Sequence, residues 1–107
     1  MPDRVVRFER SFFDDLDRQL PAERSSVGQP SATDFLLHDV PRLRDRLAED
    51  FEGNTLPVEG HRPIRVLIAA GSLVSSIALY AYVDRSDTVA VIALDVEPFP
   101  TGQDERD

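Results

Sequence analysis

Arg65, Tyr80 and Tyr82 are the residues whose types and spacing are best suited to chemistry. If the strands that carry them pair with Arg65 opposite Tyr80, a guanidinium lies over a phenol ring, with the second tyrosine two residues along. Such a spot would hold a phosphate or a partner's carboxylate. In RNA cleavage, the arginine would stabilise the phosphorane charge and a tyrosine would orient or stack a base. The favoured alternative is an ordinary cross-strand cation–π pair, because such pairs are common.

Arg62 and Arg85 are further candidates for binding. Arg62 comes just before the strand that carries Arg65, and Arg85 lies in the turn after the tyrosines. These residues either ring one end of a sheet or are scattered solvated side chains, and the second arrangement is the commoner one. His61 is a lone loop histidine without a neighbouring nucleophile, which is weak support for catalysis. His38 stands among aliphatic residues, so we expect it to be half-buried by packing.

The composition excludes several kinds of chemistry. The 107 residues include no cysteine and two histidines, and all twelve basic residues are arginines. Disulfides, thiolate chemistry and lysine Schiff bases are therefore excluded, and we expect no metal site and no cofactor. Twenty acidic residues give a formal charge of −8, which argues against a simple non-specific nucleic-acid binder. No phosphate-binding loop, dinucleotide fingerprint or nucleophile elbow is present, so whether the chain is an enzyme stays open.

The most apolar stretch, from Val66 to Val83, is broken by Gly71 and several serines. A buried hairpin explains it better than a membrane span, and the first residues lack the apolar core of a signal peptide. We therefore expect a cytoplasmic protein with no membrane contact. We expect one domain over residues 1–107, with 101–107 as a frayed tail.

Two helical regions are predicted in the first half. A short strand over 4–8 precedes a helix over 12–20, which Ser11 would cap and Pro21 would stop. A second helical segment starts near Ser31 or Thr33. Its apolar face consists of Leu36, Val40, Leu43, Leu47 and Phe51. Pro41 splits or kinks this segment, with Asp39 as the new cap in the split form. Residues 52–63 are predicted to form a loop.

Three strands are predicted after this loop: Ile64–Ala70, Ile77–Val83 and Thr88–Val96. Four-residue turns would pair Ala70 with Ser75 and Val83 with Thr88. One face of the sheet is then apolar and covered by the helices: Ile64, Val66, Ile68, Ile77, Leu79, Ala81, Ala90, Ile92 and Leu94. The other face is mixed: Arg65, Leu67, Tyr80, Tyr82, Val89, Val91 and Asp95. The predicted fold class is α+β, with a short N-terminal strand, two helical segments and a three-strand antiparallel meander, the helices packed on one sheet face.

This order resembles the RelE/ParE superfamily of bacterial toxins. The likeness covers most of the chain and is carried by Val5-Val6-Arg7-Phe8, Ser11 to Leu16, Ile64 to Gly71, Ile77 to Tyr82 and Thr88 to Ile92. The resemblance implies a toxin-fold protein of a toxin–antitoxin system. Ribonuclease members of that family place basic and aromatic or histidine residues at the end of the last strand, where this chain has Asp95 and Glu97. We therefore expect binding to a protein target or an antitoxin, with weak or absent ribonuclease activity; if RNA is cleaved, Arg65, Tyr80, Tyr82 and Arg62 are the residues to suspect.

Two alternatives belong to other classes. An acidic single-domain protein could be an inhibitor that occupies a basic nucleic-acid-binding site, with the net charge steering its approach. Acids clustered on one face would favour this mimicry. The other alternative is a small oligomerisation module, a homodimer paired through the open sheet face by Leu67, Val89 and Val91.

Overall fold

The structure is a computed structural model that describes residues 3–23 and 30–99. These residues form four helices and one five-stranded sheet with the strand order β1-β5-β4-β3-β2. The elements are β1 (Val6–Phe8), α1 (Arg10–Gln19), α2 (Ala32–His38), α3 (Val40–Glu49), α4 (Phe51–Asn54), β2 (Leu56–Pro57), β3 (Arg65–Ala70), β4 (Ser76–Val83) and β5 (Val89–Glu97). The tail predicted over 101–107 lies outside the described residues.

The predicted α+β class is confirmed, but the sheet is mixed rather than a purely antiparallel three-strand meander. Strands β3, β4 and β5 do form an antiparallel meander. The short first strand joins it in parallel, with Val6 opposite Val89 and Phe8 opposite Val91. Part of the predicted 52–63 loop forms α4 and β2, and β2 adds a fifth strand beside Val66. The sequence predicts β1 as a strand but not its partner in the sheet, and β2 has two residues, too few to show the hydrophobic period that predicts a strand.

The helices begin and end largely where the sequence predicts, with two exceptions. Ser31 and Asp34 form a reciprocal capping box at the start of α2, and the helical segment splits before Pro41 at Asp39. However, Glu9 and not Ser11 is the N-cap residue of α1. Asp39 occupies the cap position of α3 without a side-chain capping bond. In both places the predicted capping side chain bonds a strand or loop that lies far along the chain.

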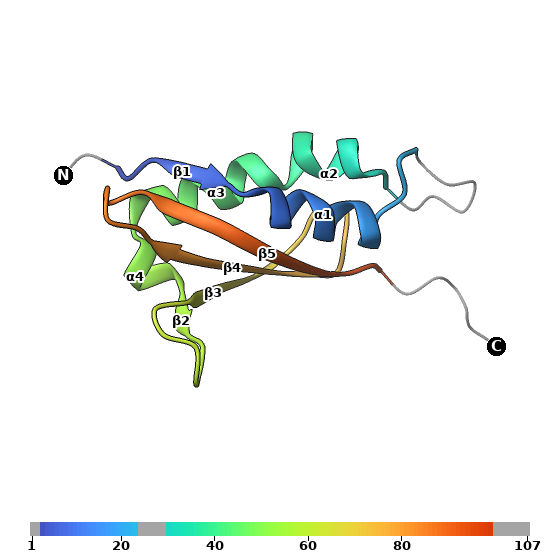
Figure 1. Cartoon of the computed structure of the whole chain (residues 1–107). Helices are drawn as coiled ribbons and strands as arrows, with labels where there is room; N and C mark the ends of the chain where they lie inside the picture. Colours follow the sequence, from blue (N-terminus) through green and yellow to red (C-terminus); the bar gives the residue numbers. More distant parts are fainter. Residues whose placement is uncertain (1–2, 24–29, 100–107) are drawn as a thin grey trace.

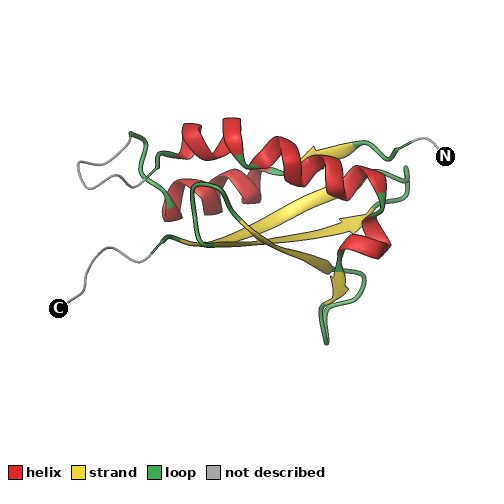
Figure 2. Ribbon diagram, turned by 180° about the vertical axis from the view of Figure 1, so that it is seen from behind, coloured by secondary structure: helices red, strands yellow, loops and turns green. Residues whose placement is uncertain are grey.

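Helices α1, α2 and α3 cover one face of the sheet, and α4 lies at one end of it (Figures 1 and 2). The core lies between these two layers. It is formed by Phe12, Leu16, Phe35, Leu43, Leu47 and Phe51 from the helices and by Leu67, Ile77, Leu79, Ala81, Val89, Val91 and Leu94 from the sheet. No helix of the described residues is long and apolar enough to cross a membrane.

The predicted strand registers are wrong by one residue. Ala70 pairs with Ser76 and Val83 with Val89, so each connecting turn has five residues rather than four. A slip of one residue moves every side chain to the other face. Leu67, predicted on the mixed face, is therefore 1% exposed in the core, whereas Ile68, predicted in the core, is 61% exposed.

A register shift in β5 restores the predicted face for the end of that strand. Ala81 lies opposite Val91, whereas Tyr80 lies opposite Ala93, so Ile92 is an extra residue. Such a bulge reverses which alternate residues face the core. Val89 and Val91 are consequently buried before the bulge, against prediction, and Leu94 is buried after it, as predicted.

Helix α1 takes the place of a strand along the outer edge of β5. The Ser11 hydroxyl donates to the Ile92 carbonyl, the Asp15 carboxylate accepts from the Leu94 N–H at 2.9 Å, and the Gln19 amide accepts from the Val96 N–H at 2.8 Å. Four helical residues rise by about 6 Å, and two strand residues span about 6.6 Å. The matched spacing lets every fourth helix residue bond every second strand residue, so side chains from α1 continue the edge where β1 ends.

Candidate functional site

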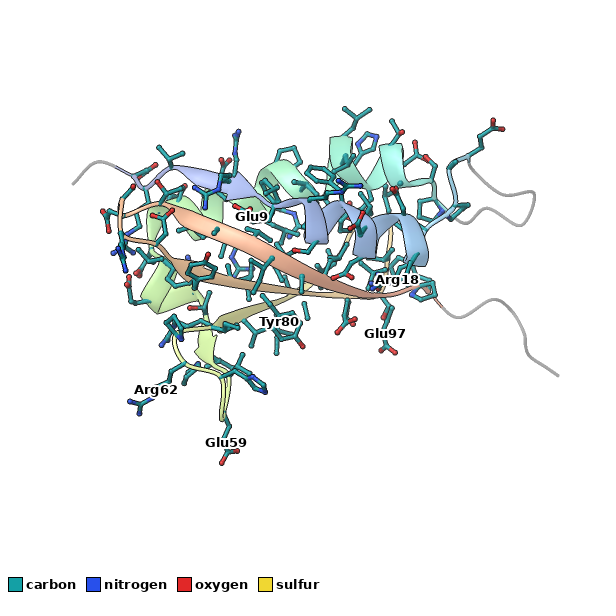
Figure 3. The ribbon with its side chains drawn as sticks, viewed as in Figure 1. Glu9, Arg18, Glu59, Arg62, Tyr80 and Glu97 are labelled. Carbon is teal, nitrogen blue, oxygen red and sulfur yellow. The ribbon has the colours of Figure 1, made fainter. Side chains whose placement is uncertain are left out.

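The two tyrosines lie together on the sheet face that the helices leave uncovered. Leu79 and Ala81 are fully buried against the helices, and side chains alternate along a strand, so Tyr80 and Tyr82 point to the other side. Figure 3 shows Tyr80 pointing away from the helices. We call this surface the outer face and define it by Leu56, Val66, Ile68, Ala78, Tyr80, Tyr82 and Ala93, which the strand pairings place on one side.

The outer face is apolar and lacks acidic residues at its centre. Ile68 is 61% and Leu56 60% exposed, an unusual degree for large aliphatic side chains of a sheet. No aspartate or glutamate occurs between Gly60 and Val83, although the chain has twenty acids. Asp95 lies opposite Ala78 on this face and Glu97 opposite Ser76, and both are exposed. The part of the outer face formed by β3 and β4 is therefore free of acids, whereas the end of β5 adds two.

Arg65 lies on the opposite side of the sheet from the tyrosines, so the predicted Arg65–Tyr80 pair is wrong. Its cross-strand neighbour is Ala81, on the core-facing side. Its guanidinium donates to the Thr55 hydroxyl at 2.8 Å and to the Thr55 carbonyl at 3.0 Å. The Thr55 hydroxyl in turn donates to the Phe51 carbonyl at 2.6 Å. Arg65 thus fastens the end of α4 to β3 instead of presenting a cation for binding.

The other predicted candidates are not gathered with the tyrosines. Arg62 and His61 are exposed in the loop between β2 and β3, and Figure 3 shows Arg62 projecting away from the sheet. Arg85 is exposed in the turn between β4 and β5. His38 is exposed at the end of α2, not half-buried as predicted, because it lies on the solvent side of the helix. Arg62 and Arg85 are therefore both exposed in loops, one before β3 and one after β4, at the sheet end where Arg65 lies opposite Ala81.

Arginines neutralise many of the acids locally. Arg4 bonds Glu52 at 2.9 Å and Asp87 at 3.0 Å, and Arg7 contacts Glu9 and Asp84. The hydrogen bond from Arg4 lowers the pKa of Glu52. These pairs tie the first strand to α4 and to the β4–β5 turn. Carboxylates that are paired with arginines in this way are not free to imitate the phosphates of a nucleic acid.

Asp39, which the sequence predicts only as a helix cap, is a buried polar site. Its side chain is completely buried, and its carboxylate accepts from the Ser72 N–H, the Ser72 hydroxyl and the Leu73 N–H. Arg42 donates to the same carboxylate at 2.9 Å. Burial raises the pKa of Asp39, but the bonds from Ser72, Leu73 and Arg42 outweigh it, and the pKa lies below its usual value. The site is fully partnered and structural; only the pairing of distant segments reveals it.

Among the residues that the structure describes, no group of three or more histidine, aspartate or glutamate side chains could hold a metal ion. In comparisons with known proteins, no family model, no curated protein and no solved structure matches the chain. The outer face, with its two tyrosines and exposed aliphatic side chains, is therefore the candidate site on geometry alone.

Proposed function

We propose that this chain is a RelE/ParE-like toxin-fold protein that acts by binding a protein, either an antitoxin or a cytoplasmic target. The observation that carries the proposal is the outer face: two tyrosines beside exposed aliphatic side chains, with no described helix over them. Tyrosines with an apolar surround are typical of protein interfaces, because the ring buries area and the hydroxyl keeps a polar contact.

The position of Arg65 favours binding over RNA cleavage. A ribonuclease built on these residues would need a cation close to the tyrosines to stabilise the phosphorane charge. Arg65 instead donates its bonds to Thr55 and to the Glu52 carbonyl. Without a cation on the tyrosine side of β3, catalysis by this set of residues is not supported.

The acidic-inhibitor alternative has less support. Mimicry of nucleic acid needs free acids in one array, whereas Asp39, Glu52, Asp84 and Asp87 bond arginines that lie close by. Leu67, Val89 and Val91 cannot pair two copies as predicted, because all three side chains are buried in the core.

The test is inducible expression in a bacterial host, with growth and transcript integrity followed together. Wild type is compared with Tyr80→Ser, Tyr82→Ser and the double variant. Leu37→Ser is the matched control, because Leu37 is 66% exposed on α2 and away from the sheet. Thermal unfolding of each purified variant establishes that it is folded.

We expect growth arrest with intact transcripts, weakened by the tyrosine variants and unchanged by Leu37→Ser. Arrest with cut transcripts would overturn the non-catalytic part of the proposal. Normal growth at high expression of wild type would overturn the toxin function in that host.

A further inference from the structure

We propose that two copies of this chain associate through the free edge of β3, with the strands antiparallel about a two-fold axis at Ala69. The two sheets would then form one continuous sheet across the interface. The inference goes beyond the proposed function, because it uses the backbone edge of β3 rather than the tyrosines; Ile68 is the residue of the outer face that it also involves.

Only the first part of β3 is paired on its outer side. Strand β2 is two residues long and covers Arg65 and Val66. The Ile64 carbonyl accepts from the Val58 N–H, and the Ala70 carbonyl accepts from Arg42 at 3.3 Å. Backbone groups of alternate residues point to the same edge of a strand. The even-numbered residues of β3 therefore point outward, and Ile68 and Ala70 lie beyond the end of β2.

Three outward groups have no partner among the described residues: the Ile68 N–H, the Ile68 carbonyl and the Ala70 N–H. At the opposite edge of the sheet, β1 and side chains of α1 form hydrogen bonds with the backbone of β5 as far as Val96. Proteins commonly protect an exposed edge with charge, proline or a covering element. The edge from Leu67 to Ala70 has no charged residue and no proline. It is thus open for a further strand.

A second copy fits this edge because the free groups are reciprocal. With Ala69 on the axis, Ile68 lies opposite Ala70 of the second copy. Each of the two resulting pairs exchanges two N–H···O=C bonds, which makes four in all. The Ala70 carbonyl keeps a second lone pair beside its bond from Arg42. Gly71 of the second copy would lie opposite Leu67, one residue short of Val66, where the pairing with β2 begins.

Charge also favours a second copy over a basic partner. Each chain carries a formal charge of −8, so two copies repel unless they meet where acids are missing. The stretch from Gly60 to Val83 contains β3, β4 and no acid. A strongly basic partner would contact the acidic surface and not this neutral edge. The Ile68 side chain, 61% exposed, would lie beside Ala70 of the second copy on the outer face.

The test places a positive charge at residue 68 in one variant and a negative charge there in another, and measures each variant alone and the two mixed. In the dimer, the two copies of residue 68 are diagonal neighbours about 7–8 Å apart. Ile68→Lys and Ile68→Glu should each dimerise more weakly than wild type, because like charges then meet across the axis. An equal mixture of the two variants should associate more strongly than either variant alone, because the charges are opposite. Leu37→Lys, at the 66% exposed Leu37 of α2, is the matched control.

Sedimentation velocity over a micromolar-to-millimolar series measures the mass, and amide hydrogen exchange locates the interface. We expect wild type and Leu37→Lys to approach twice the monomer mass, with exchange at Ile68 and Ala70 slowed about tenfold at high concentration. A monomeric wild type, an Ile68→Lys variant that dimerises normally, or a dimer without slower exchange at these two amides would overturn the proposal. Unfolding curves of both charge variants verify that each is folded.

Discussion

The Asp39 carboxylate holds Ser72 by two bonds, one from its backbone N–H at 2.9 Å and one from its hydroxyl at 2.7 Å. Asp39 is the hinge between α2 and α3, and Ser72 is in the β3–β4 turn. The bonds therefore fix the helical layer to the sheet. Gly71 allows this turn to close tightly on itself, because a Cβ there would lie 2.6 Å from the Val74 carbonyl oxygen.

Replacing this carboxylate should be one of the most destabilising single changes in the chain. Asp39→Ala leaves the Ser72 and Leu73 donors buried without an acceptor, so we expect the free energy of unfolding to fall by about 3 kcal/mol. Urea unfolding measures it. Asp45→Ala, which removes an exposed ion pair with Arg44, should change the same quantity by less than about 0.5 kcal/mol; equal losses in both variants would contradict this account.

Acid should destabilise the fold through Asp39. The pKa of Asp39 is lowered in the folded state, below an unfolded value of about 3.9. Its contribution is therefore fully present above the unfolded pKa and is lost as the pH falls through the folded pKa. We expect the free energy of unfolding to decrease below about pH 4, and less steeply in Asp39→Asn, which cannot titrate. Urea unfolding at a series of pH values measures both slopes, and identical slopes would exclude the role of Asp39.

Side chains of α1 should protect the edge of β5. Gln19→Ala removes the acceptor of the Val96 N–H and the donor to the Leu94 carbonyl. We expect a loss of about 1 kcal/mol and faster amide exchange at Val96. Asp17→Ala, an exposed position of the same helix, is the control and should leave the exchange at Val96 unchanged. Unaltered exchange in Gln19→Ala would show that β5 does not depend on this edge contact.

Arg65 should behave as a structural residue. Arg65→Lys replaces a planar fork, which bonds the Thr55 hydroxyl and carbonyl together, by a single ammonium group. We expect a loss of about 1–2 kcal/mol in the free energy of unfolding and faster exchange in α4 and β2. The growth assay distinguishes a structural role of Arg65 from a binding role. Partial destabilisation of the variant without loss of growth arrest supports the structural role. Complete loss of growth arrest in a stably folded variant would instead show that Arg65 is a binding residue.

Local signals accounted for most of the elements. Ser31 and Asp34 predicted the capping box, Pro41 predicted the break between α2 and α3, and the change from helical to alternating hydrophobic period located β3, β4 and β5. These features depend on neighbours within a few residues, which a sequence displays directly. The outward position of both tyrosines also followed from the alternation within β4.

Tertiary structure alone decided the registers, the positions of β1 and β2, and therefore the site. Turns of four and five residues are both compatible with the sequence, yet the turn length decides which face of the sheet each residue of β3 occupies, including Arg65, Leu67 and Ile68. Asp39 is predicted only as a helix cap, and Gln19 has no predicted role, until the fold brings Ser72 and Val96 to them. A hydrogen bond between distant segments has no sequence period, because the path of the chain between its two ends determines whether it can form.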